Sequence, residues 1–151
     1  MPILNADQVI DGLRDTALRG ASRAALLTRA AELIREAGAP YTSVYLYMLH
    51  GDELHLEGWS GRDTEHTSIP VGKGVCGTAV ATGLDQNVGD VTAIGNYIAC
   101  NLYTRSELVV LIRRGEEILG QIDVDSDHIN PFTPDEVAAV RRVADAMGTL
   151  L

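Results

Sequence analysis

Apolar residues near both ends of the chain recur every three or four positions, which is the period of an amphipathic helix. Within residues 1–38 this spacing predicts two helices, the second starting after the N-cap Ser22 and stopping at Gly38. Near the other end, TPDE at 133–136 has the form of a capping box with proline in the first helical position. It predicts a C-terminal helix within residues 133–151.

Between the helices, short runs rich in valine, isoleucine, leucine and tyrosine are bounded by turn residues, a pattern typical of β-strands. Strands are predicted at 41–49, 53–60, 65–70, 87–88, 106–113 and 116–126, with a short helix at 75–82. Residues 83–105 are otherwise irregular.

This order of elements predicts an α+β fold in a single domain that spans residues 1–151. Residues 41–126 would form an antiparallel sheet together with the segment that crosses it, and the terminal helices would pack together on one face. The short helix and the irregular segment would cover the other face. A segment of roughly twenty irregular residues often forms a lid or a binding wall, so we expect a ligand pocket beneath it.

Composition narrows the class of protein. A formal charge of −9 argues against binding nucleic acid or an anionic membrane through a basic face. The N-terminus lacks the basic and apolar regions of a signal peptide, and no apolar run approaches the ~18 residues of a membrane span. We therefore predict a cytoplasmic protein whose cysteines are reduced, catalytic or inert. The cysteines and histidines show no zinc-binding motif, so no metal is predicted.

Cys76 and Cys100 are the two cysteines, and each is a candidate for thiol chemistry. Cys76 lies at the start of the short predicted helix, where backbone dipoles favour a thiolate. Cys100 lies in the irregular covering segment. The alternative is that each is a small buried apolar residue, which is the commoner role of a single cysteine.

Three acids could supply partners for a thiol. In QIDVDS, Asp123 and Asp125 alternate with apolar residues and therefore point to one face of their strand. A hairpin turn at 114–115 would put Glu107 opposite residues 122–123, close to Asp123. Carboxyl groups gathered in this way cannot all ionise at low cost, so at least one would donate a proton near neutral pH. The alternative is that these acids only solvate an edge of the sheet.

Tyr41, Tyr45 and Tyr47 are spaced to share one face of the first strand, where they would form core or the wall of an apolar pocket. His66 is expected on the surface. A cysteine facing a proton-donating acid in such a pocket suggests that a thiolate attacks an electrophilic centre while the acid protonates its oxygen. Reduction of a peroxide or a sulfoxide would fit, with the second cysteine closing a disulfide on the sulfenic acid.

The chain contains the motifs GVCGTA, IAC, the SE that follows, DVDS and FTPDE. In these motifs it resembles a GAF domain. More narrowly, the chain is similar to the free methionine-(R)-sulfoxide reductases, a GAF-fold family that acts on the free amino acid. The resemblance runs from about Tyr41 to Glu136, which is most of the chain.

The resemblance implies a role for each candidate residue by position. Cys100 matches the catalytic cysteine of the family, and Cys76 matches its resolving partner. Glu107, Asp123 and Asp125 match the acids that hold the sulfoxide and amino groups of the substrate, one of them protonated.

The resemblance also implies that Tyr41 and Tyr45 surround the methyl group of the substrate, although Tyr41 stands where tryptophan is usual. Many members carry a third cysteine where this chain has His66, so recycling would depend on a disulfide between Cys76 and Cys100. The resemblance further implies that the protein binds no cofactor, that thioredoxin reduces it and that it forms a homodimer. Two other functions stay open: a GAF module that senses a small molecule without turnover, and a redox-sensing or peroxide-reducing thiol protein.

Overall fold

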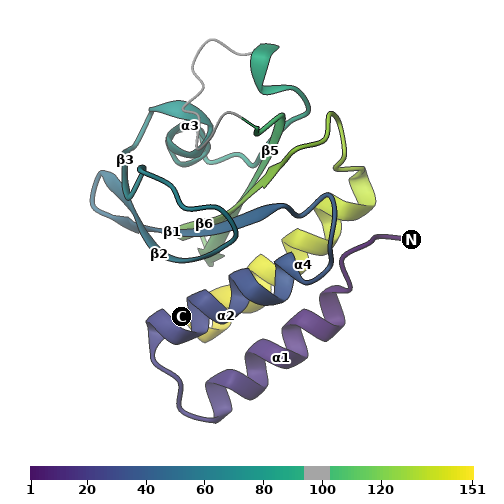
Figure 1. Ribbon diagram of the computed structural model, residues 1–151. Helices are drawn as coiled ribbons and strands as arrows, with labels where there is room; N and C mark the ends of the chain where they lie inside the picture. The colour runs from purple at the N-terminus through teal and green to yellow at the C-terminus, as the bar shows by residue number, and fades with distance from the viewer. Residues whose placement is uncertain (94–102) are drawn as a thin grey trace.

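The computed structural model describes residues 1–93 and 103–151, and Figure 1 shows helices layered on a sheet. The helices are α1 (Ala6–Leu18), α2 (Arg23–Arg35), α3 (Gly74–Thr82) and α4 (Pro134–Leu150), with the short 3-10 helix η1 (Val91–Ala93). The strands are β1 (Ser43–His50), β2 (Glu53–Ser60), β3 (Ser68–Pro70), β4 (Gln86–Val88), β5 (Ser106–Arg114) and β6 (Glu117–Ser126). In the described parts of the chain, no helix combines the length and the apolar character needed to cross a membrane.

The strands form one antiparallel sheet in the order β3-β2-β1-β6-β5-β4. Helices α1, α2 and α4 lie on one face of this sheet, and α3 lies on the other (Figure 1). The predicted α+β fold, with an antiparallel sheet and the terminal helices on one face, is confirmed. The predicted covering segment falls partly on residues 94–102, which lie outside the described residues, and so does Cys100.

The alternation of side chains along β1 divides the interior into two apolar clusters. Val44, Leu46 and Met48 pack against the helix layer, while Tyr45 and Tyr47 pack on the side of α3. Successive residues of a strand point to opposite faces, so one strand can serve both clusters. The cluster on the side of α3 also contains Cys76, and this face holds the candidate site.

Tyr41 does not share a face with Tyr45, so that part of the predicted pocket is wrong. The chain still turns at this point, because the Tyr41 amide donates to the Gly38 carbonyl at 2.9 Å, and β1 begins only at Ser43. The strand alternation therefore does not extend back to Tyr41. Its ring lies in the helix-side cluster, edge-on to Phe132 with 5.6 Å between ring centroids.

Glu136, in the first turn of α4, is a buried carboxylate that fixes the N-terminal segment. It accepts hydrogen bonds from the amides of Ile3 at 2.6 Å and Leu4 at 3.1 Å, and from the Tyr41 hydroxyl at 2.7 Å. The Thr133 side of the predicted capping box is present, since Thr133 Oγ1 accepts from the Glu136 amide at 3.4 Å. The Glu136 side chain thus joins three distant parts of the chain.

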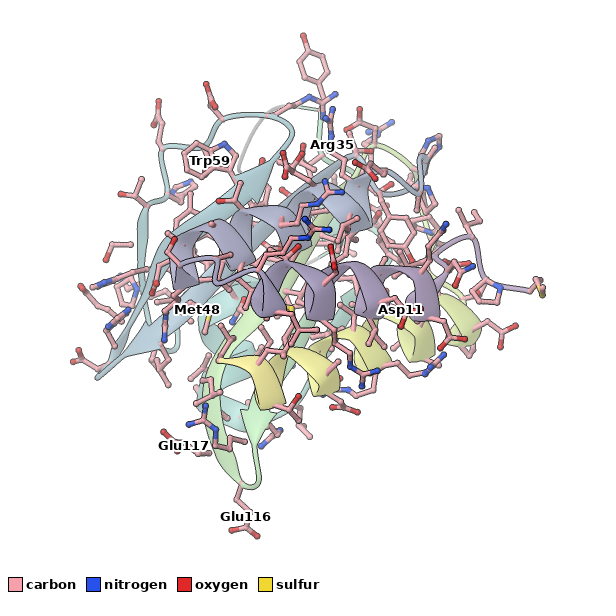
Figure 2. All side chains as sticks on the ribbon, turned by 90° about the horizontal axis from the view of Figure 1, so that it is seen from below. Asp11, Arg35, Met48, Trp59, Glu116 and Glu117 are labelled. Atoms are coloured by element: carbon pink, nitrogen blue, oxygen red, sulfur yellow. The ribbon has the colours of Figure 1, made fainter. Side chains whose placement is uncertain are left out.

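The β5–β6 hairpin has a different register from the one predicted. The turn is formed by residues 115–116, one position later than expected, and Figure 2 shows Glu116 and Glu117 projecting at its tip. An irregularity after Ile112 shifts the pairing by a further position. As a result Glu107 faces Asp125 directly, and Asp123 lies diagonally across from it. The predicted pairing of Glu107 with residues 122–123 is therefore wrong, although all three acids still share one face.

Candidate active site

The three acids lie on inner strands of the sheet and are shielded from solvent. Glu107 on β5 is 3% exposed, and Asp123 and Asp125 on β6 are 0% and 1% exposed. Asp123 also pairs with Tyr45 on the other side of β6. The interpretation of these acids as solvating groups at a sheet edge is therefore wrong, and their burial requires a chemical reason.

Helix α3 carries Cys76 to the acids, and a glycine-rich turn allows it to dock closely. A Cβ atom on Gly77 would lie 2.5 Å from the Pro70 carbonyl oxygen, so a larger residue there would push the helix away from β3. Gly74, with a φ of +64°, begins α3 in the left-handed region that glycine adopts without strain. Cys76 follows within the first helical turn.

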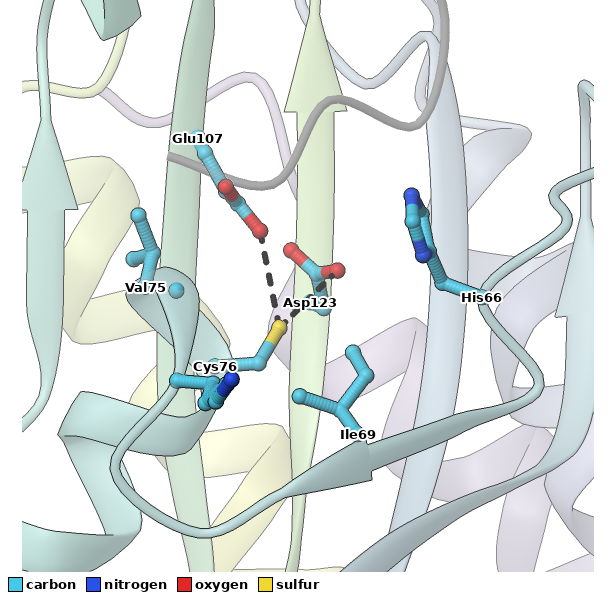
Figure 3. Close-up of a pocket in the computed structure, with 8 residues that line it drawn as sticks. His66, Ile69, Val75, Cys76, Glu107 and Asp123 are labelled. Carbon is cyan, nitrogen blue, oxygen red and sulfur yellow. Dashed lines mark hydrogen bonds between the residues drawn. The ribbon is translucent and has the colours of Figure 1, made fainter. Parts of the chain in front are cut away.

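The Cys76 sulfur lies against two of the acids. Its Sγ is 3.3 Å from Asp123 Oδ2 and 3.6 Å from Glu107 Oε2, both within hydrogen-bonding distance for sulfur (Figure 3). The Cys76 side chain is buried. The structure thus brings together Cys76, Glu107 and Asp123, three of the predicted site residues, and their donor atoms all lie within 4.8 Å of one another.

Burial shifts the acid–base properties of this group. It raises the pKa of Glu107 from 4.5 to about 8, and the negative charge of Asp125 adds to the effect. Burial also raises the pKa of Asp123 well above its usual range, with the charge of Glu107 as the second cause. Neither carboxyl forms an ion pair within the described residues. The Glu107 carboxyl group, with its pKa of about 8, is therefore available as a proton donor near neutral pH.

A small pocket of about 10 Å³, roughly the room of one water molecule, opens beside the thiol. It is lined by His66, Ile69, Lys73, Gly74, Val75, Cys76, Glu107 and Asp123. Because Lys73 is exposed and His66 is partly exposed, the pocket reaches the surface between them. His66, expected only on the surface, thus belongs to the wall of the site.

Two tyrosines support the segment that carries His66. The Tyr45 hydroxyl donates to the Arg62 carbonyl, and the Tyr47 hydroxyl donates to the His66 carbonyl, each at 2.7 Å. Tyr45 therefore lies on the predicted face, next to Asp123, and is fully buried. Sequence analysis did not identify the positioning role of these hydroxyls, because the carbonyls that they bind lie 17 and 19 residues away.

Gln121 is a buried positioning residue that sequence analysis also missed. Its Nε2 donates to the Cys76 carbonyl at 3.0 Å and so joins α3 to β6 beneath the thiol. The only sequence signal is an amide in an otherwise apolar and acidic strand face.

Replacing Gln121 with leucine should lower the free energy of unfolding by about 1–3 kcal/mol, because the Cys76 carbonyl loses its donor in the interior. Urea unfolding measures this loss, and the alkylation rate of the Cys76 thiol should rise as α3 loosens. Gln86→Leu is the matched control, because the Gln86 amide is bonded at the surface. Equal stability of the two variants would contradict the positioning role.

Comparisons with known proteins identify the family of the chain. The GAF domain family matches residues 22–151. Free methionine-R-sulfoxide reductase of Escherichia coli is 34% identical over 105 residues, which cover 70% of this chain and 63% of that protein, less than two-thirds of its length.

Two solved structures match over almost the whole chain. One is a type II free methionine-R-sulfoxide reductase from Thermoplasma acidophilum, with 31% identity, a TM-score of 0.80 and 94% of each chain covered. The other is a free methionine-R-sulfoxide reductase from Neisseria meningitidis in complex with its substrate, with 31% identity and a TM-score of 0.86. It covers 96% of this chain and 84% of that one. From its fold, its buried thiol–carboxyl site and these matches, the chain belongs to the GAF domain family.

Proposed function

We propose that this protein reduces free L-methionine-(R)-sulfoxide to methionine with a thiol as the electron donor. The observation that carries the proposal is the Cys76 thiol in contact with two buried carboxyl groups whose pKa values are raised. The similarity to free methionine-R-sulfoxide reductases supports this oxidoreductase function over a sensing module without turnover.

The acids would provide the proton that a sulfoxide needs in order to lose its oxygen. Glu107 is the proposed donor, because its pKa of about 8 keeps it protonated near neutral pH. It can therefore give its proton to the sulfoxide oxygen during the reaction. Asp123 and Asp125 would engage the sulfoxide and the ammonium group of the amino acid. Tyr45, beside Asp123, would contact the methyl group, whereas Tyr41 is bound to Glu136 on the other side of the sheet.

Cys100 is the proposed nucleophile on the basis of the sequence motif, since it lies outside the described residues. Its thiolate would attack the sulfoxide sulfur while Glu107 protonates the oxygen. The hydroxyl would then move from the substrate sulfur to Cys100 as the new sulfur–sulfur bond breaks, which releases methionine as the thioether and leaves Cys100 as a sulfenic acid. The Cys76 thiol would then displace water from that sulfenic acid, forming a disulfide that an external dithiol reduces. Thioredoxin is the proposed physiological dithiol, and a homodimer stays a prediction.

The test is the consumption of the separated R and S epimers of free methionine sulfoxide, with dithiothreitol as reductant. We expect turnover of the R epimer only, and loss of turnover in Cys100→Ser. Cys76→Ser should keep a first turnover and recycle slowly, because only external thiol can then reduce the sulfenic acid. The control substrate is methionine sulfoxide within a peptide, which should not react.

Each contrary result has a distinct meaning. Saturable binding of methionine sulfoxide without turnover would replace the proposal with a sensing module. Peroxide consumption without sulfoxide reduction would replace it with a peroxide-reducing thiol protein. Full activity in Cys100→Ser, with none in Cys76→Ser, would make Cys76 the attacking residue.

A further inference from the structure

The thiol and the two carboxyl groups of the site form a set of donor atoms that suits a metal ion. One sulfur, from Cys76, and one oxygen each from Glu107 and Asp123 lie within 4.8 Å of one another. All three residues are buried, and they come from three different elements, α3, β5 and β6. The set is therefore held by the fold rather than by a flexible loop.

The spacing of these atoms fits tetrahedral coordination. Zinc binds a thiolate sulfur at about 2.3 Å and a carboxylate oxygen at about 2.0–2.2 Å, so two such ligands lie about 3.5–3.7 Å apart. The Cys76 sulfur is 3.3 Å from Asp123 Oδ2 and 3.6 Å from Glu107 Oε2. Both separations agree with that geometry within about 0.2 Å, the tolerance expected of a real site.

A second observation is an unsatisfied oxygen at the same place. Asp123 Oδ1 is buried and has no hydrogen-bond partner among the described residues. Asp123 lines the pocket, and Figure 3 shows both of its oxygens on the side of Cys76 and Glu107. A bound cation would satisfy such an atom, since buried carboxylates are ordinarily paired or bound to metal.

The surroundings provide charge and access. Glu107 and Asp123 form no ion pair within the described residues, so their carboxylates, once deprotonated, would be available to neutralise the charge of a divalent cation. The pocket has roughly the room of one water molecule and reaches the surface beside Lys73. That room is enough for one ion held by the three donor atoms.

We propose that a thiophilic divalent cation of the zinc class binds at Cys76, Glu107 and Asp123. The cation occupies the carboxyl groups and the thiol, so it competes with substrate and inhibits turnover; this consequence rests on the proposed function. Removal of the cation by a chelator restores activity. No spacing motif in the sequence indicates this site, because two of its three ligands are carboxylates on separate strands.

The stacked pair His50 and His55 is the strongest competing candidate for metal binding. Their ring centroids are 4.6 Å apart, but their Nε2 atoms already contact Glu57 at 2.6 Å and Glu53 at 3.1 Å. His50 is exposed and His55 is partly exposed, and the pair does not belong to a described set of three converging donors. It serves as the control for adventitious surface binding.

The experiment is a titration of the reduced full-length protein with Co²⁺, a spectroscopic substitute for Zn²⁺. We expect one equivalent to produce a sulfur-to-cobalt charge-transfer band that Zn²⁺ abolishes. The band should persist in Cys100→Ser and in the double variant His50→Ala/His55→Ala, and it should disappear in Cys76→Ser. Asp123→Asn and Glu107→Gln keep the thiol and should weaken cobalt binding at least ~10-fold.

The inference is overturned if the band is absent from the wild type, survives in Cys76→Ser, or keeps its affinity in Asp123→Asn. Because cobalt binding is measured without substrate, it can fail or succeed independently of the reductase activity. Cobalt binding at Cys76 without sulfoxide reduction would contradict the proposed function and support the metal site. Sulfoxide reduction in the presence of a chelator, with no cobalt band, would remove only the metal site.

Discussion

Replacing Glu107 with glutamine is expected to slow sulfoxide reduction about 100-fold or more and, at the same time, to stabilise the protein at pH 8. The loss of rate follows from the removal of a positioned proton donor. The gain in stability follows from the removal of a buried carboxyl group that faces Asp125 across the hairpin. Glutamine has nearly the same volume, so packing is preserved.

The stability effect has a definite dependence on pH. The pKa of Glu107 rises from 4.5 to about 8 in the folded protein, because of burial first and the Asp125 charge second. Between these values the unfolded chain has lost the proton and the folded protein keeps it. The free energy of unfolding therefore falls as pH rises, by up to about 1.4 kcal/mol per pH unit, and the loss is complete above the folded pKa.

Urea unfolding at several pH values between 5 and 9, with a chelator present, measures this dependence. The wild type should lose stability across the range, and Glu107→Gln should show a flatter curve and exceed the wild type at pH 8 by about 2 kcal/mol. Glu116→Gln, at the exposed tip of the hairpin, is the matched control and should follow the wild type. A Glu107→Gln curve parallel to that of the wild type would show that this carboxyl ionises normally in the folded protein.

Replacing Glu136 with alanine should lower the free energy of unfolding by about 3–5 kcal/mol. The substitution leaves the amides of Ile3 and Leu4 and the Tyr41 hydroxyl without their acceptor. Unsatisfied buried donors cost about 1–3 kcal/mol each, and relaxation of the N-terminal segment recovers part of the sum. Urea unfolding gives the total, and limited proteolysis should show earlier cleavage before α1.

Two further variants separate the hydrogen bonds of Glu136 from a general effect of altering α4. Glu136→Gln keeps one acceptor oxygen and should lose less stability than Glu136→Ala. Asp135→Asn changes the preceding residue, whose side chain is 69% exposed and pairs with the terminal amine at 3.7 Å, and should cost less than about 1 kcal/mol. Equal losses in Glu136→Ala and Asp135→Asn would contradict the role assigned to Glu136.

The fold was predictable where the evidence lies within one element. The helical spacing of the terminal segments and the alternation of Asp123 with Asp125 both depend on residues of the same helix or strand. Those predictions are confirmed. The pairing of Glu107 with Asp125 was not predictable, because it depends on the position of the turn and on an irregularity after Ile112. Neither leaves a signal in residue spacing.

The candidate site shows the same limit. The position of Cys76 in the first turn of a helix could be predicted from GVCGTA, but its contact with Asp123 joins residues 47 positions apart. The even spacing of Tyr41 and Tyr45 predicts one shared face, but the chain turns at Tyr41 and the strand begins only at Ser43, so the alternation does not reach Tyr41. The support that Gln121 gives to Cys76 is likewise a long-range contact, which only the folded chain displays.

The order of the strands has a consequence for redesign. Because β5 and β6 each have a neighbour on both sides, backbone ladders fix the spacing of the carboxyl groups that they carry. The opposite wall has no such framework, since Val75 and Ile69 come from α3 and from an edge strand. To make the site accept a new ligand, one would therefore vary Val75 and Ile69, which line the pocket, and keep the carboxyl groups on β5 and β6 that supply the proton.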